Sequence, residues 1–172
     1  MNTGLQVAAF YGFFTATAAG FAALLGLLFV AFTLRWQEIG SNARLRFTAI
    51  GSTEALVGGL MVSLCVLLPG QGPAAVGWEI VGLSALFALA SLLEASRLLK
   101  ERPLSAALWM RIASIPIVFA AAVGAGASLI AGSGPGLYLE AGLFITAFPV
   151  VTWNAWEAVW PPDSHSKARK HH

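Results

Sequence analysis

The sequence predicts an all-α fold: a polytopic membrane protein with five transmembrane helices, its N-terminus outside and its C-terminus in the cytoplasm. Hydrophobic residues make up 58% of the 172 positions and charged residues only 10%, whereas about a quarter of an average globular domain is charged. Five apolar stretches are each long enough to cross a hydrocarbon core of about 30 Å. The basic residues follow alternate stretches, and this asymmetry predicts the orientation.

The first span is expected at 10–34, which contains no charged residue. This run is too long for the apolar core of a cleavable signal peptide and no basic segment precedes it, so we expect it to stay in the mature protein. The other four spans are expected at 47–68, 74–97, 104–131 and 137–160. Residues 1–160 then form a single transmembrane domain and residues 161–172 a cytoplasmic tail.

The basic residues fall where one side of a membrane would be. They are Arg35, Arg44 and Arg46 after the first span, Arg97, Lys100 and Arg102 after the third, Arg111 just inside the fourth, and Lys167, Arg169 and Lys170 after the fifth. The connections after the second and fourth spans carry no charge. Short cytoplasmic loops hold an excess of Lys and Arg, so the basic connections are expected inside, against anionic lipid headgroups.

Tryptophan is expected to anchor the bundle at its interfaces. One tryptophan, Trp78, maps to an outer end, and five map to inner ends of spans: Trp36, Trp109, Trp153, Trp156 and Trp160. Amphipathic indole rings favour the membrane–water interface, which makes these residues anchors. An aromatic wall of a ligand site is the alternative interpretation of the three tryptophans on the fifth span.

Small residues at intervals of four predict close helix packing, because backbones approach each other in lipid where side chains are small. The second span carries Gly51, Ala55, Gly59 and Ser63 in this pattern. The first span offers Gly20 and Gly26, and the fourth offers Gly124, with Ala122 and Gly126 alongside. These stripes either pack within one chain or join the subunits of an oligomer.

A polar cluster is expected inside the membrane near the inner side. Glu54, Arg111 and Asn154 lie at similar depths in three spans, and Glu157 lies one turn from Asn154. Charged side chains inside a bilayer are costly unless they pair or face the bundle interior. The cluster is either a structural clamp in which Glu54 meets Arg111, or a polar pocket or ion path open to the cytoplasm. Arg111 can also extend to the inner surface without a partner.

Two further acids, Glu79 and Glu140, lie near the outer starts of their spans. Placed on the outer surface, they would either attract a cation or be solvated at the level of the headgroups.

The sequence argues against an enzyme. All three histidines, His165, His171 and His172, lie in the tail, where the last two are consistent with a tag remnant. Cys65 is the single cysteine, so the spans offer neither a Ser–His or Cys–His pair nor an imidazole for haem or metal. No catalytic residues, cofactor, metal site or nucleic-acid partner is expected.

Three segments resemble small, mostly uncharacterised bacterial membrane proteins that are often labelled modulators of the FtsH protease. These are AGFAALLGLLFVAFTL at 19–34, LLPGQGPAAVGWEIVGL at 67–83 and NAWEAVW at 154–160. The resemblance implies a multi-pass protein of the bacterial inner membrane, and it brings no catalytic residues.

Two functions are compatible with these features. The first is a non-enzymatic scaffold, regulator or accessory subunit that contacts another membrane protein through its helix faces. The alternative is a homo-oligomeric channel or carrier with the Glu54/Arg111/Asn154 cluster on its path.

Overall fold

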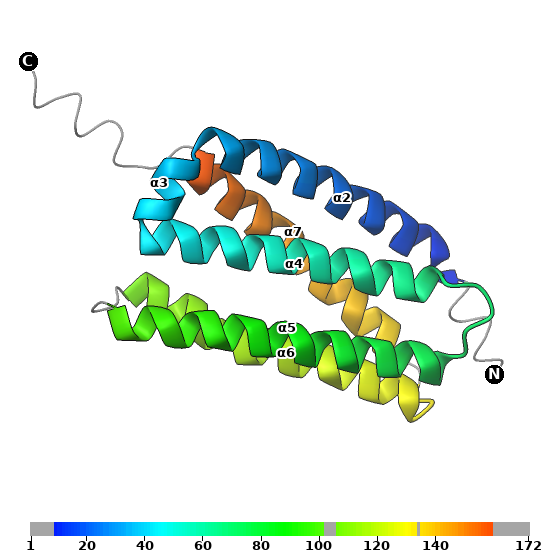
Figure 1. The fold of residues 1–172 in the computed structure, drawn as a ribbon. Coiled ribbons are helices and arrows are strands. Elements are labelled where there is room, and N and C mark those ends of the chain that lie inside the picture. The colour runs from blue at the N-terminus through cyan, green and yellow to red at the C-terminus, as the bar shows by residue number, and fades with distance from the viewer. Residues whose placement is uncertain (1–8, 102–105, 134, 160–172) are drawn as a thin grey trace, which may run out of the picture.

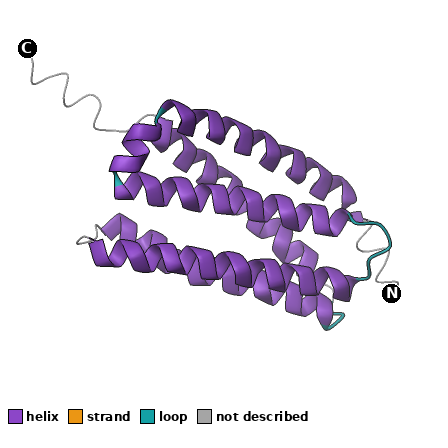
Figure 2. Cartoon of the chain, viewed as in Figure 1, coloured by secondary structure: helices purple, strands orange, loops and turns teal. Residues whose placement is uncertain are grey.

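A computed structural model describes residues 9–101, 106–133 and 135–159, and every regular element in them is a helix (Figures 1 and 2). The helices are α2 (Tyr11–Leu34), α3 (Trp36–Ser41), α4 (Ala43–Leu67), α5 (Pro73–Glu101), α6 (Ala106–Ile130) and α7 (Gly136–Val159). Five of them, all except α3, are long and apolar enough to cross a membrane. The predicted all-α fold with five membrane-spanning helices is therefore confirmed.

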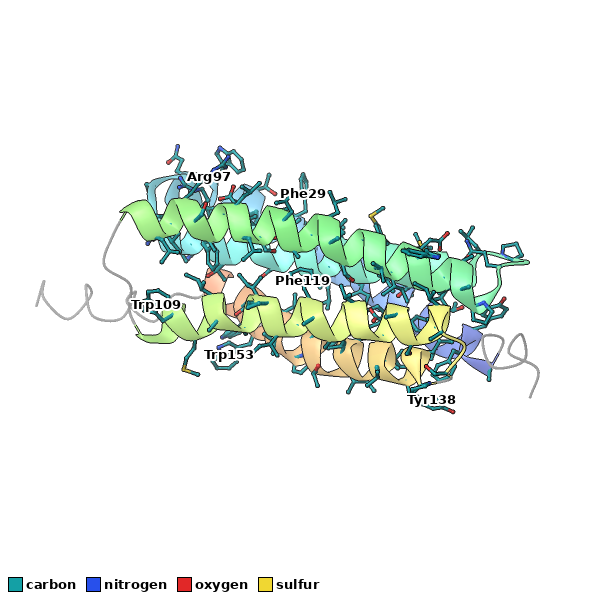
Figure 3. The ribbon with its side chains drawn as sticks, turned by 90° about the horizontal axis from the view of Figure 1, so that it is seen from below. Phe29, Arg97, Trp109, Phe119, Tyr138 and Trp153 are labelled. Atoms are coloured by element: carbon teal, nitrogen blue, oxygen red, sulfur yellow. The ribbon has the colours of Figure 1, made fainter. Side chains whose placement is uncertain are left out.

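The connections with basic residues meet at one end of the bundle, which we call the inner end; the opposite end is the outer end. Figure 3 shows Arg97 and Trp109 at the inner end and Tyr138 at the outer end. Which end faces the cytoplasm remains the prediction made from the basic residues.

The first inner connection is helical. The chain leaves α2 at Arg35, and α3 follows at once. Asn42 is extended, and its side-chain oxygen accepts a hydrogen bond from the backbone N–H of Leu45 at 3.4 Å, which caps α4. Hydropathy marks where the membrane begins, whereas the capping residue marks where the helix begins, so α4 starts before the apolar run at 47.

Among the described residues, each outer connection has one glycine in the left-handed region. Gly70 has a φ of 80° and Gly132 a φ of 69°, a conformation that residues with a Cβ rarely adopt. Pro73 then opens α5, where a missing N–H has no cost. These turns keep the helices that they join adjacent and antiparallel.

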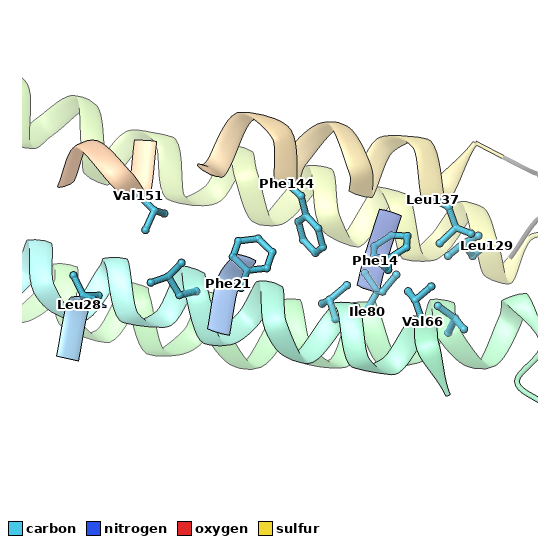
Figure 4. Packing of buried hydrophobic residues seen from close by; sticks show 12 residues of the cluster. Phe14, Phe21, Leu28, Val66, Ile80, Leu129, Leu137, Phe144 and Val151 are labelled. Carbon is cyan, nitrogen blue, oxygen red and sulfur yellow. The ribbon is translucent and has the colours of Figure 1, made fainter. Parts of the chain in front are cut away.

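Four helices form a ring in which α4 contacts α5, α5 contacts α6, α6 contacts α7, and α7 contacts α4. Helix α2 lies outside the ring, packed against α4 and α7. An aromatic core joins α2 to α7: Phe21 of α2 contacts Phe144 and Phe148 of α7, with ring centroids 5.1 Å and 4.7 Å apart. Figure 4 shows Phe14, Phe21 and Phe144 in this core.

Helices α6 and α7 are close at the outer end and diverge towards the inner end (Figure 1). At the outer end, a Cβ on Gly136 would lie 2.5 Å from the carbonyl oxygen of Ala125. Towards the inner end, α7 crosses obliquely to the side of α2 while α6 stays beside α5. The ring is therefore closed at its outer end and wider at its inner end.

Only some residues of the predicted small-residue stripes pack against other helices of the chain. A Cβ on Gly59 would lie 2.6 Å from the ring of Phe21, one on Gly20 would lie 2.7 Å from the ring of Phe148, and Ser63 is fully buried. These three positions pack against other helices of the same chain.

The remaining small residues do not pack in this way. No described atom lies within 4 Å of a Cβ placed on Gly26, Gly51 or Gly124, and Ala55 is exposed. On α6 the packing glycine is Gly126, whose added Cβ would lie 2.7 Å from the carbonyl oxygen of Gly77. Gly26, Gly51, Ala55 and Gly124 therefore do not pack against other helices in the described part of the chain, and contact with another subunit at these positions stays a prediction.

The described tryptophans point outwards. Trp36, Trp78, Trp109, Trp153 and Trp156 are each more than half exposed, as membrane-interface anchors would be. Trp160 lies outside the described residues.

Candidate functional site

A cavity of about 310 Å³ lies inside the ring of α4, α5, α6 and α7, with Phe21 of α2 at its wall. Most of its lining is apolar. The polar lining residues are Thr48, Ser52, Glu54, Ser84, Ser91, Glu94, Ser114, Glu140 and Asn154. Exposed lining residues such as Ser114, Val118 and Val150 belong to the inner halves of α6 and α7, so the cavity opens where these two helices diverge.

The inner part of the cavity is its more polar part. Glu54 of α4 accepts a hydrogen bond of 2.7 Å from the Ser91 hydroxyl of α5. Glu94 lies one turn further along α5 and pairs with Arg97 at 2.7 Å. Asn154 of α7 lines the same space. Three helices thus direct hydrogen-bonding groups into one region.

The outer part of the cavity ends at Glu140. This side chain is only 3% exposed, and its Oε2 has no hydrogen-bond partner among the described residues. Ser84 of α5, also buried, is two helical turns further towards the outer end than Ser91 and lines the same region. A carboxyl group in an apolar site without a partner is costly when ionised, so its presence here calls for a functional explanation.

The placement of Glu140 on the outer surface, which both sequence interpretations assumed, was wrong. Gly136 packs against Ala125 and Leu129 of α6, so α7 begins below the outer end of α6 and not level with it. Glu140 follows one turn deeper, ~10 Å below Ile130 at a rise of ~1.5 Å per residue. The turn before α7 therefore brings this acid into the bundle.

The two polar regions are separated by an aromatic section. Glu54 lies five residues before Gly59, which packs on Phe21, and Phe21 in turn contacts Phe144. Glu140 lies one turn beyond Phe144, so about nine residues of helical rise, ~13 Å, separate the two carboxyl groups. Phe87 and Phe119 also line the cavity.

The predicted polar cluster is only partly described. Glu54 and Asn154 do line one cavity. The side chains of Arg111 and Glu157 lie outside the described residues, so the pairing of Glu54 with Arg111 stays a prediction. Glu94 and Ser91 were not selected from the sequence. Their spacing from the basic end of α5 matches the depth of Glu54 and could have indicated them.

Glu79 stays near the outer end of α5, half-buried, and accepts a hydrogen bond of 2.6 Å from the Gln71 amide. It is not part of the cavity lining. Within the described residues, no group of three or more His, Cys, Asp or Glu side chains is placed to hold a metal ion.

No family model matches this chain, and no curated protein or solved structure is significantly similar to it. The resemblance to modulators of the FtsH protease therefore remains an expectation from the sequence.

Proposed function

We propose that the protein is a carrier or binding protein that takes up a small amphipathic molecule in the cavity between α4, α5, α6 and α7. One observation carries the proposal: a single chain encloses about 310 Å³ with an apolar lining and a polar group at each end. Small-molecule sites have this size and character, with a few polar groups that orient the ligand in a mainly apolar pocket.

The position of the opening supports a ligand that arrives from the membrane. The exposed lining residues of α6 and α7, Ser114, Val118 and Val150, belong to the half of the bundle near the basic connections. In the predicted orientation this opening faces the cytoplasmic leaflet, from which an amphipathic molecule would enter. The resemblance noted above supports the bacterial inner membrane as the location of the protein.

Filling the cavity tests the proposal. Gly51 lines the cavity and has no described atom within 4 Å of its Cβ position, so Gly51→Phe should fill the cavity with little disturbance of packing. Gly26→Phe is the matched control, because Gly26 also has open space around it but does not line the cavity.

The probes are N-methyl-4-phenylpyridinium, a flat apolar cation, and its neutral isostere 4-methylbiphenyl. Native mass spectrometry of the purified protein in mild detergent would count bound probe. We expect the wild type and Gly26→Phe to bind at least one probe, and Gly51→Phe to bind neither. Equal binding by all three proteins, or by none, would contradict the proposal.

A scaffold or regulator remains the second candidate, favoured by small residues that face away from the bundle. Gly124 and Ala120 on α6 are exposed, and Gly124 has no described neighbour around its Cβ position. Such a face permits close approach of another helix in lipid. If it is used, Gly124→Leu should remove a copy of this chain or a foreign subunit from the complex, as measured by its mass in detergent.

A further inference from the structure

We propose that Glu140 anchors a lipophilic organic cation and that its carboxyl group releases a proton when the cation binds. This inference rests on the proposed function, because it names the ligand class and the exchange that occurs in the same cavity.

The first argument is the state of Glu140. Its side chain is only 3% exposed, and its Oε2 has no described hydrogen-bond partner. It lies at the closed outer end of the cavity. An isolated ionised carboxylate in an apolar environment costs many kcal/mol, so such a group holds a proton or has a cation beside it. Glu140 holds a proton when the cavity is empty, and it pairs with the cation when the cavity is occupied.

The second argument is the set of groups around the acid. Helix α7 packs against α2, α4 and α6. The titratable side chains that line the same cavity among the described residues are Glu54 of α4 and Glu94 of α5, both acidic. Tyr11 of α2 and Tyr138 of α7 lie at the outer end and are exposed, and neither lines the cavity. The described lining thus offers Glu140 no basic partner.

The third argument is the aromatic lining of the cavity. Five phenylalanines line the cavity: Phe21, Phe47, Phe87, Phe119 and Phe144. Aromatic faces attract cations, most strongly where water is excluded, and their apolar area accommodates the body of a lipophilic ligand. A carboxyl group at the end of an aromatic pocket suits a flat or branched organic cation better than a hydrated metal ion or a neutral sterol.

The exchange is balanced. The empty site holds Glu140 as a neutral carboxylic acid, the arriving cation pairs with the carboxylate, and the O–H proton leaves to solvent. One positive charge enters the site and one leaves it, and no covalent bond other than that O–H bond breaks. Binding should therefore weaken as the pH falls, because protons compete with the cation for the same oxygen atoms.

The test measures proton release and binding together. Purified protein in mild detergent and weak buffer receives N-methyl-4-phenylpyridinium, which has no proton to release, and an indicator dye reports the pH change. The wild type should release about one proton for each bound cation, and 4-methylbiphenyl should release none. Glu140→Gln should abolish the release and weaken cation binding by about 30-fold or more, the loss expected when one partner of a buried charge pair is removed.

Two further variants test whether the released proton comes from Glu140. Glu79→Gln changes an acid near the same end of the bundle that does not line the cavity, so it should behave as the wild type. Release that is lost in Glu54→Gln and kept in Glu140→Gln would overturn the assignment to Glu140. Binding of both probes without any proton release would defeat this inference while leaving the proposed function intact, and binding of neither probe would defeat both.

A measurement on the unaltered protein covers the case in which Glu140→Gln does not fold. Dicyclohexylcarbodiimide is apolar and modifies protonated carboxyl groups in apolar sites. Peptide mass spectrometry should find the modification at Glu140, and N-methyl-4-phenylpyridinium should protect that residue. Modification at Glu54 alone, or modification of Glu140 without protection, would contradict the proposal.

Discussion

The outer and inner halves of the bundle are held together differently. In the outer half, backbones touch: an added Cβ on Gly77 would lie 2.6 Å from the carbonyl oxygen of Gly126, and one on Gly136 would lie 2.5 Å from that of Ala125. In the inner half, α6 and α7 diverge, and the cavity that begins at Glu140 continues between the helices, with Glu54, Ser91 and Asn154 on its walls. The comparison suggests that one half holds the fold while the other leaves room for a ligand.

The orientation of the bundle decides whether its open half faces the cytoplasm, and cysteine labelling tests it with an all-or-none result. With Cys65 replaced by alanine, a cysteine in place of the exposed Ser133 at the outer end should react with an impermeant thiol reagent in intact cells. A cysteine in place of the exposed Ser41, in the basic inner connection, should react only after the cells are opened. The reverse pattern would turn the wide half of the bundle towards the outside.

The division between a packed half and an open half predicts unequal losses of stability when glycine is replaced by leucine in each. Gly126→Leu should lower the free energy of unfolding by about 3 kcal/mol, because the new side chain meets the backbone of Gly77 and the side chain of Val81. Gly51→Leu should change it by less than about 1 kcal/mol, since its side chain enters open space and gains helix propensity. Thermal unfolding in detergent measures both. Equal losses would show that the cavity is closed by packing.

Substitution of the charged groups in the inner half should have an intermediate effect on stability. If Glu54 pairs with Arg111, Glu54→Gln and Arg111→Gln should each lower stability by about 2 kcal/mol, less than for a fully buried pair because Glu54 is only half-buried. The double variant should recover about 1 kcal/mol, which is the coupling that a double-mutant cycle measures. Additive losses would mean that Ser91, which donates a hydrogen bond to Glu54, is the more important partner.

Much of the packed half could be predicted from the sequence, and little of the open half. Hydropathy is local, so the five spans were evident, and Gly59 and Ser63 were found because small residues four apart share a helix face. The burial of Glu140 depends on where α7 starts relative to α6, and the cavity depends on the oblique course of α7. Both depend on how the helices are placed relative to one another, which a residue pattern within one helix does not predict.

The smallest predicted effect concerns a hydrogen bond between helices in the packed half. Thr17 of α2 and Ser63 of α4 approach with their hydroxyl oxygens 3.3 Å apart. Each hydroxyl is also within hydrogen-bond distance of a carbonyl of its own helix, Thr17 of Phe14 at 3.0 Å and Ser63 of Gly59 at 2.7 Å. Since a hydroxyl has a single proton, the one that donates between the helices gives up its local bond. Because these local partners remain, Thr17→Val should lower the free energy of unfolding by only about 0.6 kcal/mol, the average for hydrogen bonds between membrane helices. A loss of several kcal/mol in thermal unfolding would mean that polar contacts, and not close backbone packing, hold the outer half together.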